Sequence, residues 1–165
     1  MGRRRRTLLA AIAIVALPLA SLPLAACGSG ARLPCPFAAE FVGPSDLAPL
    51  RAAIEGASPV VVAVDELWFH PDGLSCGLVM TLLVDASGAL PAAELERIGE
   101  AAWAHAPLPA NTITIVALEA DDPERSVSLA AAAEALMPGG WIPFVSEGVV
   151  LADVRAAFGP GAGAR

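Results

Sequence analysis

The first 26 residues constrain this chain most, because their pattern removes them from any fold. Four consecutive arginines, Arg3 to Arg6, precede twenty uncharged residues, Thr7 to Ala26. This order is typical of an export signal, whose positive end stays inside while the apolar stretch enters the bilayer. A stretch of that length could also span as an uncleaved helix, but Pro18 and Pro23 favour a processed leader. We therefore expect one domain, built from the remaining 139 residues.

The leader closes with Leu24-Ala25-Ala26-Cys27. These residues resemble the lipobox of bacterial lipoproteins, in which the leader is cut before the cysteine and the thiol is acylated. The resemblance implies a signal peptide over 1–26, lipidation of Cys27, and a lipid-anchored position on the outer, extracytoplasmic face of a bacterial membrane. Two or more acyl chains make release from the bilayer very slow. Residues 27–44 would then be the lipidated cysteine and an irregular tether.

The arginine run leaves two export routes open. Arg5-Arg6-Thr7-Leu8-Leu9 resembles a twin-arginine signal, which exports folded proteins. Ordinary export of the unfolded chain is the alternative, because four arginines in a row produce such a pair easily.

The charge of the rest of the chain excludes several partner classes. The whole chain has 10 basic and 17 acidic residues and no lysine. Without the four leader arginines, six basic residues remain and the net charge is −11. Nucleic-acid binding requires clustered cations. Binding to anionic lipid headgroups also requires a cluster of basic side chains. We expect membrane lipid at Cys27, an envelope protein partner, and no nucleic acid.

Two cysteines remain once Cys27 is lipidated. An even pair in an oxidising compartment predicts a disulfide between Cys35 and Cys76. A bridge across about 40 residues would stabilise the fold by roughly 3–4 kcal/mol in the chain-entropy description. The alternative is two independent thiols, with Cys76 as a small apolar strand residue.

Apolar spacing indicates four helices in a single domain over 45–158, followed by a tail over 159–165. The first helix is capped by Ser45 or Asp46 and stops at Gly56. The strongest pattern covers Pro91 to Ala106. Its apolar face consists of Leu95, Ile98, Gly99, Ala102 and Ala106. A third helix follows a cap at Ser128 and carries Leu129, Ala132, Ala133 and Leu136, and a last short one carries Leu151, Val154 and Phe158.

Three strands are predicted, over Val60 to Val64 with an extension to Phe69, over Leu78 to Val84, and over Thr112 to Leu118. The second is apolar on both faces, which indicates a central strand. The Pro71-Asp72-Gly73 turn makes the first two an antiparallel pair. We expect an α+β fold in which a small, mostly antiparallel sheet of three or four strands carries helices on one face. Its order of hairpin, helix and strand is similar to part of a ferredoxin-like layout.

The first hairpin also carries the candidate interaction surface. Along an extended strand, Glu66, Trp68 and His70 point one way, while Leu67 and Phe69 point the other. Both sides cannot easily be buried at the end of a hairpin, which leaves two interpretations open, and in the first an aromatic side chain is exposed, as at partner surfaces. The alternative is that the segment from Trp141 to Phe144 covers Trp68.

Patterns of catalytic and metal sites are weak. Gly73-Leu74-Ser75-Cys76-Gly77 matches the nucleophile elbow of serine hydrolases, but a turn precedes it and a strand follows it, the reverse of the required context. His70 and His105 lack the spacing of a metal pair. Asp121, Asp122 and Glu124 lack the ligand alternation of a calcium loop. We assign no catalytic residue, no metal and no cofactor.

These observations lead to a non-enzymatic, membrane-tethered binding or protein-interaction domain as the main hypothesis. The alternative is a small carrier or sensor of an apolar ligand, held between the sheet and the helix from Pro91 to Ala106. Gly99 and Ala102 could leave space there, or could allow close packing instead. A hydrolase that uses Ser75 is the third hypothesis.

Overall fold

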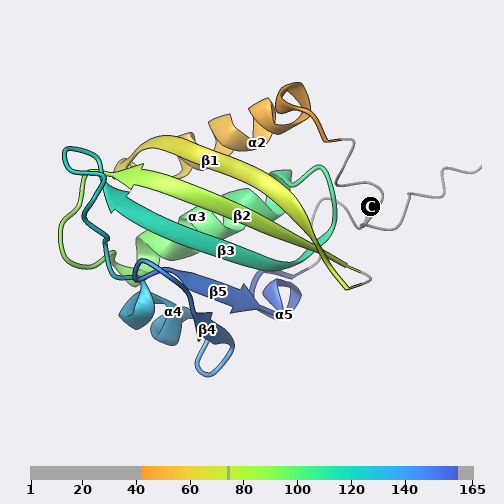
Figure 1. Cartoon of the computed structure of the whole chain (residues 1–165). Helices are drawn as coiled ribbons and strands as arrows, with labels where there is room; N and C mark the ends of the chain where they lie inside the picture. Colours follow the sequence, from red (N-terminus) through yellow and green to blue (C-terminus); the bar gives the residue numbers. More distant parts are fainter. Residues whose placement is uncertain (1–41, 74, 160–165) are drawn as a thin grey trace, which may run out of the picture. The chain divides into compact units, whose positions relative to one another are not determined.

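The fold is a five-stranded mixed sheet with helices on one face (Figure 1). It is known from a computed structural model that describes residues 42–73 and 75–159. The strands are β1 (Val61–Asp72), β2 (Ser75–Val84), β3 (Ala110–Glu119), β4 (Trp141–Pro143) and β5 (Val149–Ala152). The helices are α2 (Pro44–Ala57), α3 (Ala92–His105), α4 (Ala130–Leu136) and α5 (Val154–Phe158). The predicted α+β class is confirmed, with five strands where three or four were expected.

The strand order is β1-β2-β3-β5-β4. β2 and β3 run parallel, and the other three neighbouring pairs are antiparallel. The chain passes from β2 to β3 through α3, because parallel neighbours need a crossover connection. The central position predicted for β2 is confirmed.

The short strands β4 and β5 were not predicted, because three or four residues are too few to show the alternation of apolar and polar side chains that marks a strand. The spacing of Leu151, Val154 and Phe158 predicted one helix, and this is wrong for Leu151, which lies in β5. The helix begins only at Val154, after Asp153 adopts a left-handed conformation with φ +54°. The apolar residues of the four-residue strand β5 and of the five-residue helix α5 happen to follow the spacing of a single helix.

The start of α2 also differs from its prediction. Pro44 was assigned to the tether but is the first residue of the helix, where its missing N–H costs nothing. The cap is Gly43, and neither Ser45 nor Asp46 occupies that position. The Asp46 carboxylate instead accepts the Gly43 N–H at 2.9 Å from the third helical position. It therefore stabilises the same helix end from inside the first turn.

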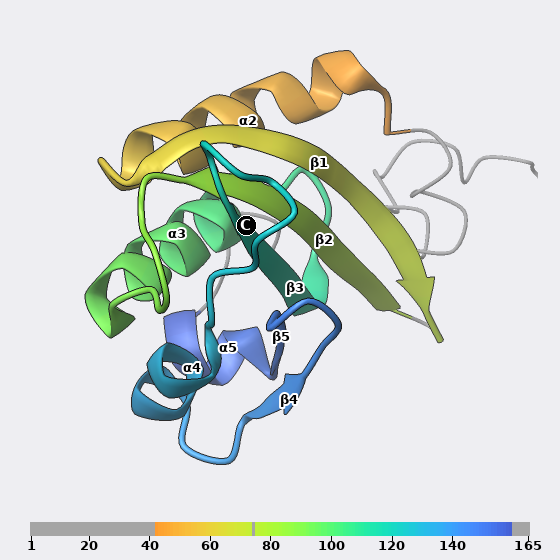
Figure 2. The same cartoon turned by 60° about the vertical axis from the view of Figure 1, so that its left-hand side comes forward.

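All four described helices pack on the same face of the sheet. Figures 1 and 2 show α2 and α3 side by side behind β1 to β3. The ring of Phe158 in α5 packs against Gly99 of α3, and the Trp141 indole donates to Glu134 of α4 at 2.7 Å. The strand residues turned toward these helices are fully buried: Cys76, Leu78, Met80, Leu82, Val84, Ile113, Ile115, Ala117, Val149 and Leu151. The hydrophobic core therefore lies between the sheet and the helices on this face.

Both outer edges of the sheet resist strand addition. β1 has two irregularities in its register, between Val61 and Ala63 and between Val64 and Glu66. The Val64 N–H on this strand is taken by the Glu55 carboxylate of α2 at 3.1 Å. At the other edge, β4 has three residues and ends at Pro143, which has no N–H. Bulges, charges and proline are the features that keep edge strands from pairing with other chains.

Candidate interaction face

The opposite face of the sheet carries none of the described helices, and we call it the open face. One row of side chains crosses it through all five strands. The pairings place Trp68 opposite Val79, Val79 beside Thr114, Thr114 opposite Val150, and Val150 opposite Ile142. Four steps of about 4.8 Å give this row a length of about 19 Å.

The two ends of the row are exposed and its middle is not. Trp68 on β1 retains 47% of its surface and Ile142 on β4 retains 58%, while Thr114 between them is buried. Leu67 and Phe69, the neighbours of Trp68 in sequence, are buried on the helix side. The predicted alternation of this strand is therefore confirmed. Exposed tryptophan is enriched at protein contact surfaces.

Glu66, Trp68 and His70 lie together on this face. The Trp68 and His70 ring centroids are 5.7 Å apart, with the planes tilted by 58°. His70 Nδ1 lies 3.0 Å from the carbonyl oxygen of Pro71. The Glu66 carboxylate accepts the Thr81 hydroxyl from β2 at 3.3 Å. These contacts restrict the side chains around the tryptophan, which lowers the entropy lost when a partner covers them.

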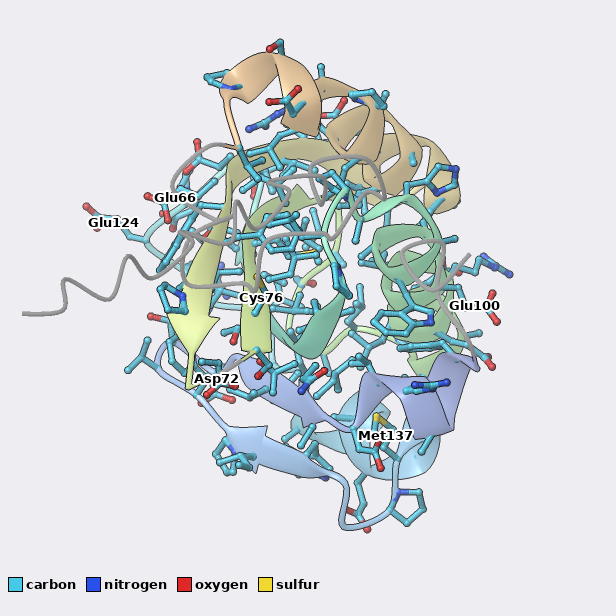
Figure 3. All side chains as sticks on the ribbon, turned by 90° about the vertical axis from the view of Figure 1, so that its right-hand side faces the viewer. Glu66, Asp72, Cys76, Glu100, Glu124 and Met137 are labelled. Atoms are coloured by element: carbon cyan, nitrogen blue, oxygen red, sulfur yellow. The ribbon has the colours of Figure 1, made fainter. Side chains whose placement is uncertain are left out.

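The charges described on the open face along β1 are acidic. Glu66 and Asp72 lie on either side of Trp68 in the same alternation, and both are exposed. The Asp72 carboxylate lies 3.5 Å from the Thr112 hydroxyl of β3. The arginines within the described residues belong to the helices and to the loop after β3: Arg51, Arg97, Arg125 and Arg155. Figure 3 shows Glu66 on the side of the sheet away from α3, and Glu100 of α3 on the other side.

The segment from Trp141 to Phe144 does not cover Trp68. Its first three residues form β4, which is the opposite edge of the sheet from β1. Its indole turns to the helix side and bonds Glu134. The covering alternative is therefore wrong, and the segment contributes Ile142 to the far end of the row.

Sequence reasoning found one end of this face and missed the other. Val79, Thr114, Val150 and Ile142 were not proposed, because their alignment depends on pairings between strands far apart in the chain. The β-branched pair Val149-Val150 after Gly148 was the one local signal of a further strand.

The serine motif lies in a hairpin, as its flanking sequence indicated. The Ser75 hydroxyl donates to the Asp72 carbonyl oxygen at 2.7 Å, which closes the turn. His70 Nδ1 faces a different carbonyl, that of Pro71. His105 lies at the end of α3, where Nδ1 is 3.0 Å from the Ala101 carbonyl oxygen. Neither of these contacts joins a histidine to the serine as a hydrolase requires.

The space that a carrier would need beside Gly99 is filled. A Cβ built on this glycine would lie 2.6 Å from Cζ of Phe158. The indole of Trp103 donates to the Gly159 carbonyl oxygen at 2.9 Å and holds the same C-terminal segment on α3. The small residues of α3 therefore serve close packing at this point.

An open cavity of about 420 Å³ lies at the ends of β2 and β3, lined in part by Asp85, Glu119 and Asp121. The Glu119 side chain is nearly buried and pairs with Arg125 at 3.2 Å. Asp121, Asp122 and Glu124, the weak calcium candidates, are exposed in the loop that follows. Within 42–73 and 75–159, no three His, Cys, Asp or Glu side chains are grouped as metal ligands.

Several predicted features lie outside the described residues. These are the signal peptide, Cys27 with its tether, Cys35, and most of the tail over 159–165. Cys76 lies at the start of β2 with no exposed surface, and its pairing with Cys35 stays a prediction. In the part of the chain that the structure covers, no helix is long and apolar enough to cross a membrane.

Comparison with known proteins found no relative. No family model, no curated protein and no solved structure matches the chain.

Proposed function

We propose that this chain is an exported lipoprotein, anchored through Cys27 on the outer face of a bacterial membrane, whose domain binds an envelope protein through the open face. The observation that carries the docking part of this proposal is the row from Trp68 to Ile142. It crosses the sheet on the face that the described helices leave uncovered, and it has an exposed apolar side chain at each end.

The edges of the sheet support a contact through the face. The register irregularities in the first part of β1, before Glu66, and the proline of β4 oppose addition of a partner strand at these places. A partner would then cover the side chains of the row. The acyl anchor would keep the domain close to the bilayer, which raises its effective concentration toward other envelope proteins.

Anchoring is tested by Cys27→Ala in cells that express the full chain. The variant should leave the membrane fraction or accumulate as an unprocessed precursor. Normal, acylated membrane protein from this variant would contradict the proposal.

Docking is tested by chemical crosslinking of the lipidated protein in cells, with mass spectrometry of the products. A reproducible partner should be captured by the wild type and lost from Trp68→Ala. Val62→Ala is the matched control, because Val62 is an exposed apolar residue of the same strand outside the row. Equal loss from both variants, or no loss from Trp68→Ala, would remove the open face from the proposal.

A further inference from the structure

We infer that the partner of the open face is a protein segment whose apolar stripe is flanked by arginine or lysine side chains. The inference rests on the proposed docking function and adds the chemistry of the partner. It follows from how apolar and acidic groups are arranged along β1.

The apolar part of the contact is given by the row itself. Its length of about 19 Å separates Trp68 from Ile142, and the side chains between them are the smaller Val79, Thr114 and Val150. A continuous apolar stripe on the partner can cover this row without desolvating a further polar side chain, because Thr114 is already buried. Trp68 would be its largest anchor, since buried tryptophans dominate binding energies at interfaces.

The charged part is given by the residues on either side of Trp68. Glu66 and Asp72 follow the same alternation along β1, and both stay exposed. A neutral or acidic partner broad enough to reach these carboxylates, about 7 and 13 Å along β1 from Trp68, would leave them partly desolvated and without an opposite charge. Cationic side chains at the rim would pair with them, and an arginine or lysine beside the Trp68 ring would gain a cation–π contact.

Charge complementarity also argues against a second copy of this chain. The mature chain has 6 basic and 17 acidic residues, and the described arginines belong to the helices and to the loop after β3. Two open faces brought together would place like charges against each other, which opposes association.

The experiment places a photo-crosslinking amino acid at position 142 of the full chain, expressed in its native cells. This position is at the far edge of the sheet from Glu66 and Asp72, so charge changes on β1 do not alter its surroundings. Mapping of the crosslinked peptide by mass spectrometry should find a protein segment that carries arginine or lysine one row length from the linked site, about 6 residues away if the segment is extended or about 13 if it is helical.

The second part of the experiment neutralises β1. Glu66→Gln with Asp72→Asn keeps side-chain oxygens that can accept the Thr81 and Thr112 hydroxyls. The yield of the crosslink should fall about 2- to 10-fold, as expected for the loss of two rim ion pairs. Glu96→Gln with Glu100→Gln makes the same charge change on exposed positions of α3 and should leave the yield unchanged.

The outcomes separate this inference from the proposed function. A protein captured from position 142 through a neutral or acidic segment, with a yield that the β1 variant does not change, overturns the inference and leaves a docking face. A linked second copy, lipid or glycan also overturns it. A crosslinker at position 142 that captures no more than one at position 100 overturns both.

Discussion

The imidazole of His70 occupies the space above Gly77, its partner across the β1–β2 pair. A Cβ built on Gly77 would overlap Nε2 and lie 2.8 Å from Cδ2 and Cε1 of the ring. The missing Cβ of Gly77 therefore leaves room for the His70 ring, which in turn contacts the ring of Trp68.

Gly77→Ala should displace the His70 ring at a small cost in stability, below about 1 kcal/mol, because the end of a side chain can rotate away. The lost contact between His70 and Trp68 would be seen in their ring resonances by NMR. In a His70→Ala background the same substitution should have no further effect. An unchanged ring environment in Gly77→Ala would contradict this account of the pair.

Gly148→Ala should destabilise the fold by about 1–3 kcal/mol, because overpacking against backbone cannot be relieved by a rotamer change. Its Cβ would lie 2.7 Å from the Ile115 carbonyl oxygen. Gly56→Ala is the matched control within α2. It meets nothing within 4 Å and should gain about 0.4–1 kcal/mol. Urea unfolding measures both, and equal effects would contradict the packing described for Gly148.

Leu82→Ala should cost about 2–5 kcal/mol, because it empties a fully buried site on the helix side of β2. Leu83→Ala, one residue further, removes the same atoms from the half-buried open face and should cost less than half as much. Chemical denaturation of the two variants tests which face holds the core. A larger loss from Leu83 would contradict the assignment of the open face.

Reduction should lower the free energy of unfolding by about 3–4 kcal/mol if Cys35 and Cys76 are bridged. Thermal unfolding with and without a reductant measures the change. Cys35→Ala should reproduce it without altering Cys76, which lies in the core. An unchanged transition, with two thiols reacting before reduction, would remove the bridge.

The sequence predicted the features whose signals are local. The spacing of Leu95, Ile98 and Ala102 indicated α3, and the apolar run from Leu78 to Val84 indicated a central strand. The alternation around Trp68 gave one end of the open face for the same reason, since neighbours along a strand point to opposite sides.

The rest depends on pairings that no local pattern records. Val150 and Ile142 join the row only because β5 adds to β3 and β4 adds to β5. Leu151 was assigned to a helix because its spacing to Val154 and Phe158 is helical, and the four residues of β5 are too few to show a strand pattern against it. The shared face of Trp68 and Ile142 is thus a property of the assembled sheet.

The order of the strands also has a kinetic consequence. The hairpin of β1 and β2 is local, whereas β3 joins only after the chain closes over residues 85–109, and such non-local pairing is slow. Until Val149–Ala152 arrives, β3 pairs with β2 on one side only, and its other edge exposes a run of β-branched residues, the kind of segment on which chains aggregate. A chain that ended or was cleaved before residue 149 would keep that strand open permanently. The four residues of β5 therefore cover this edge of β3 as well as extending the sheet.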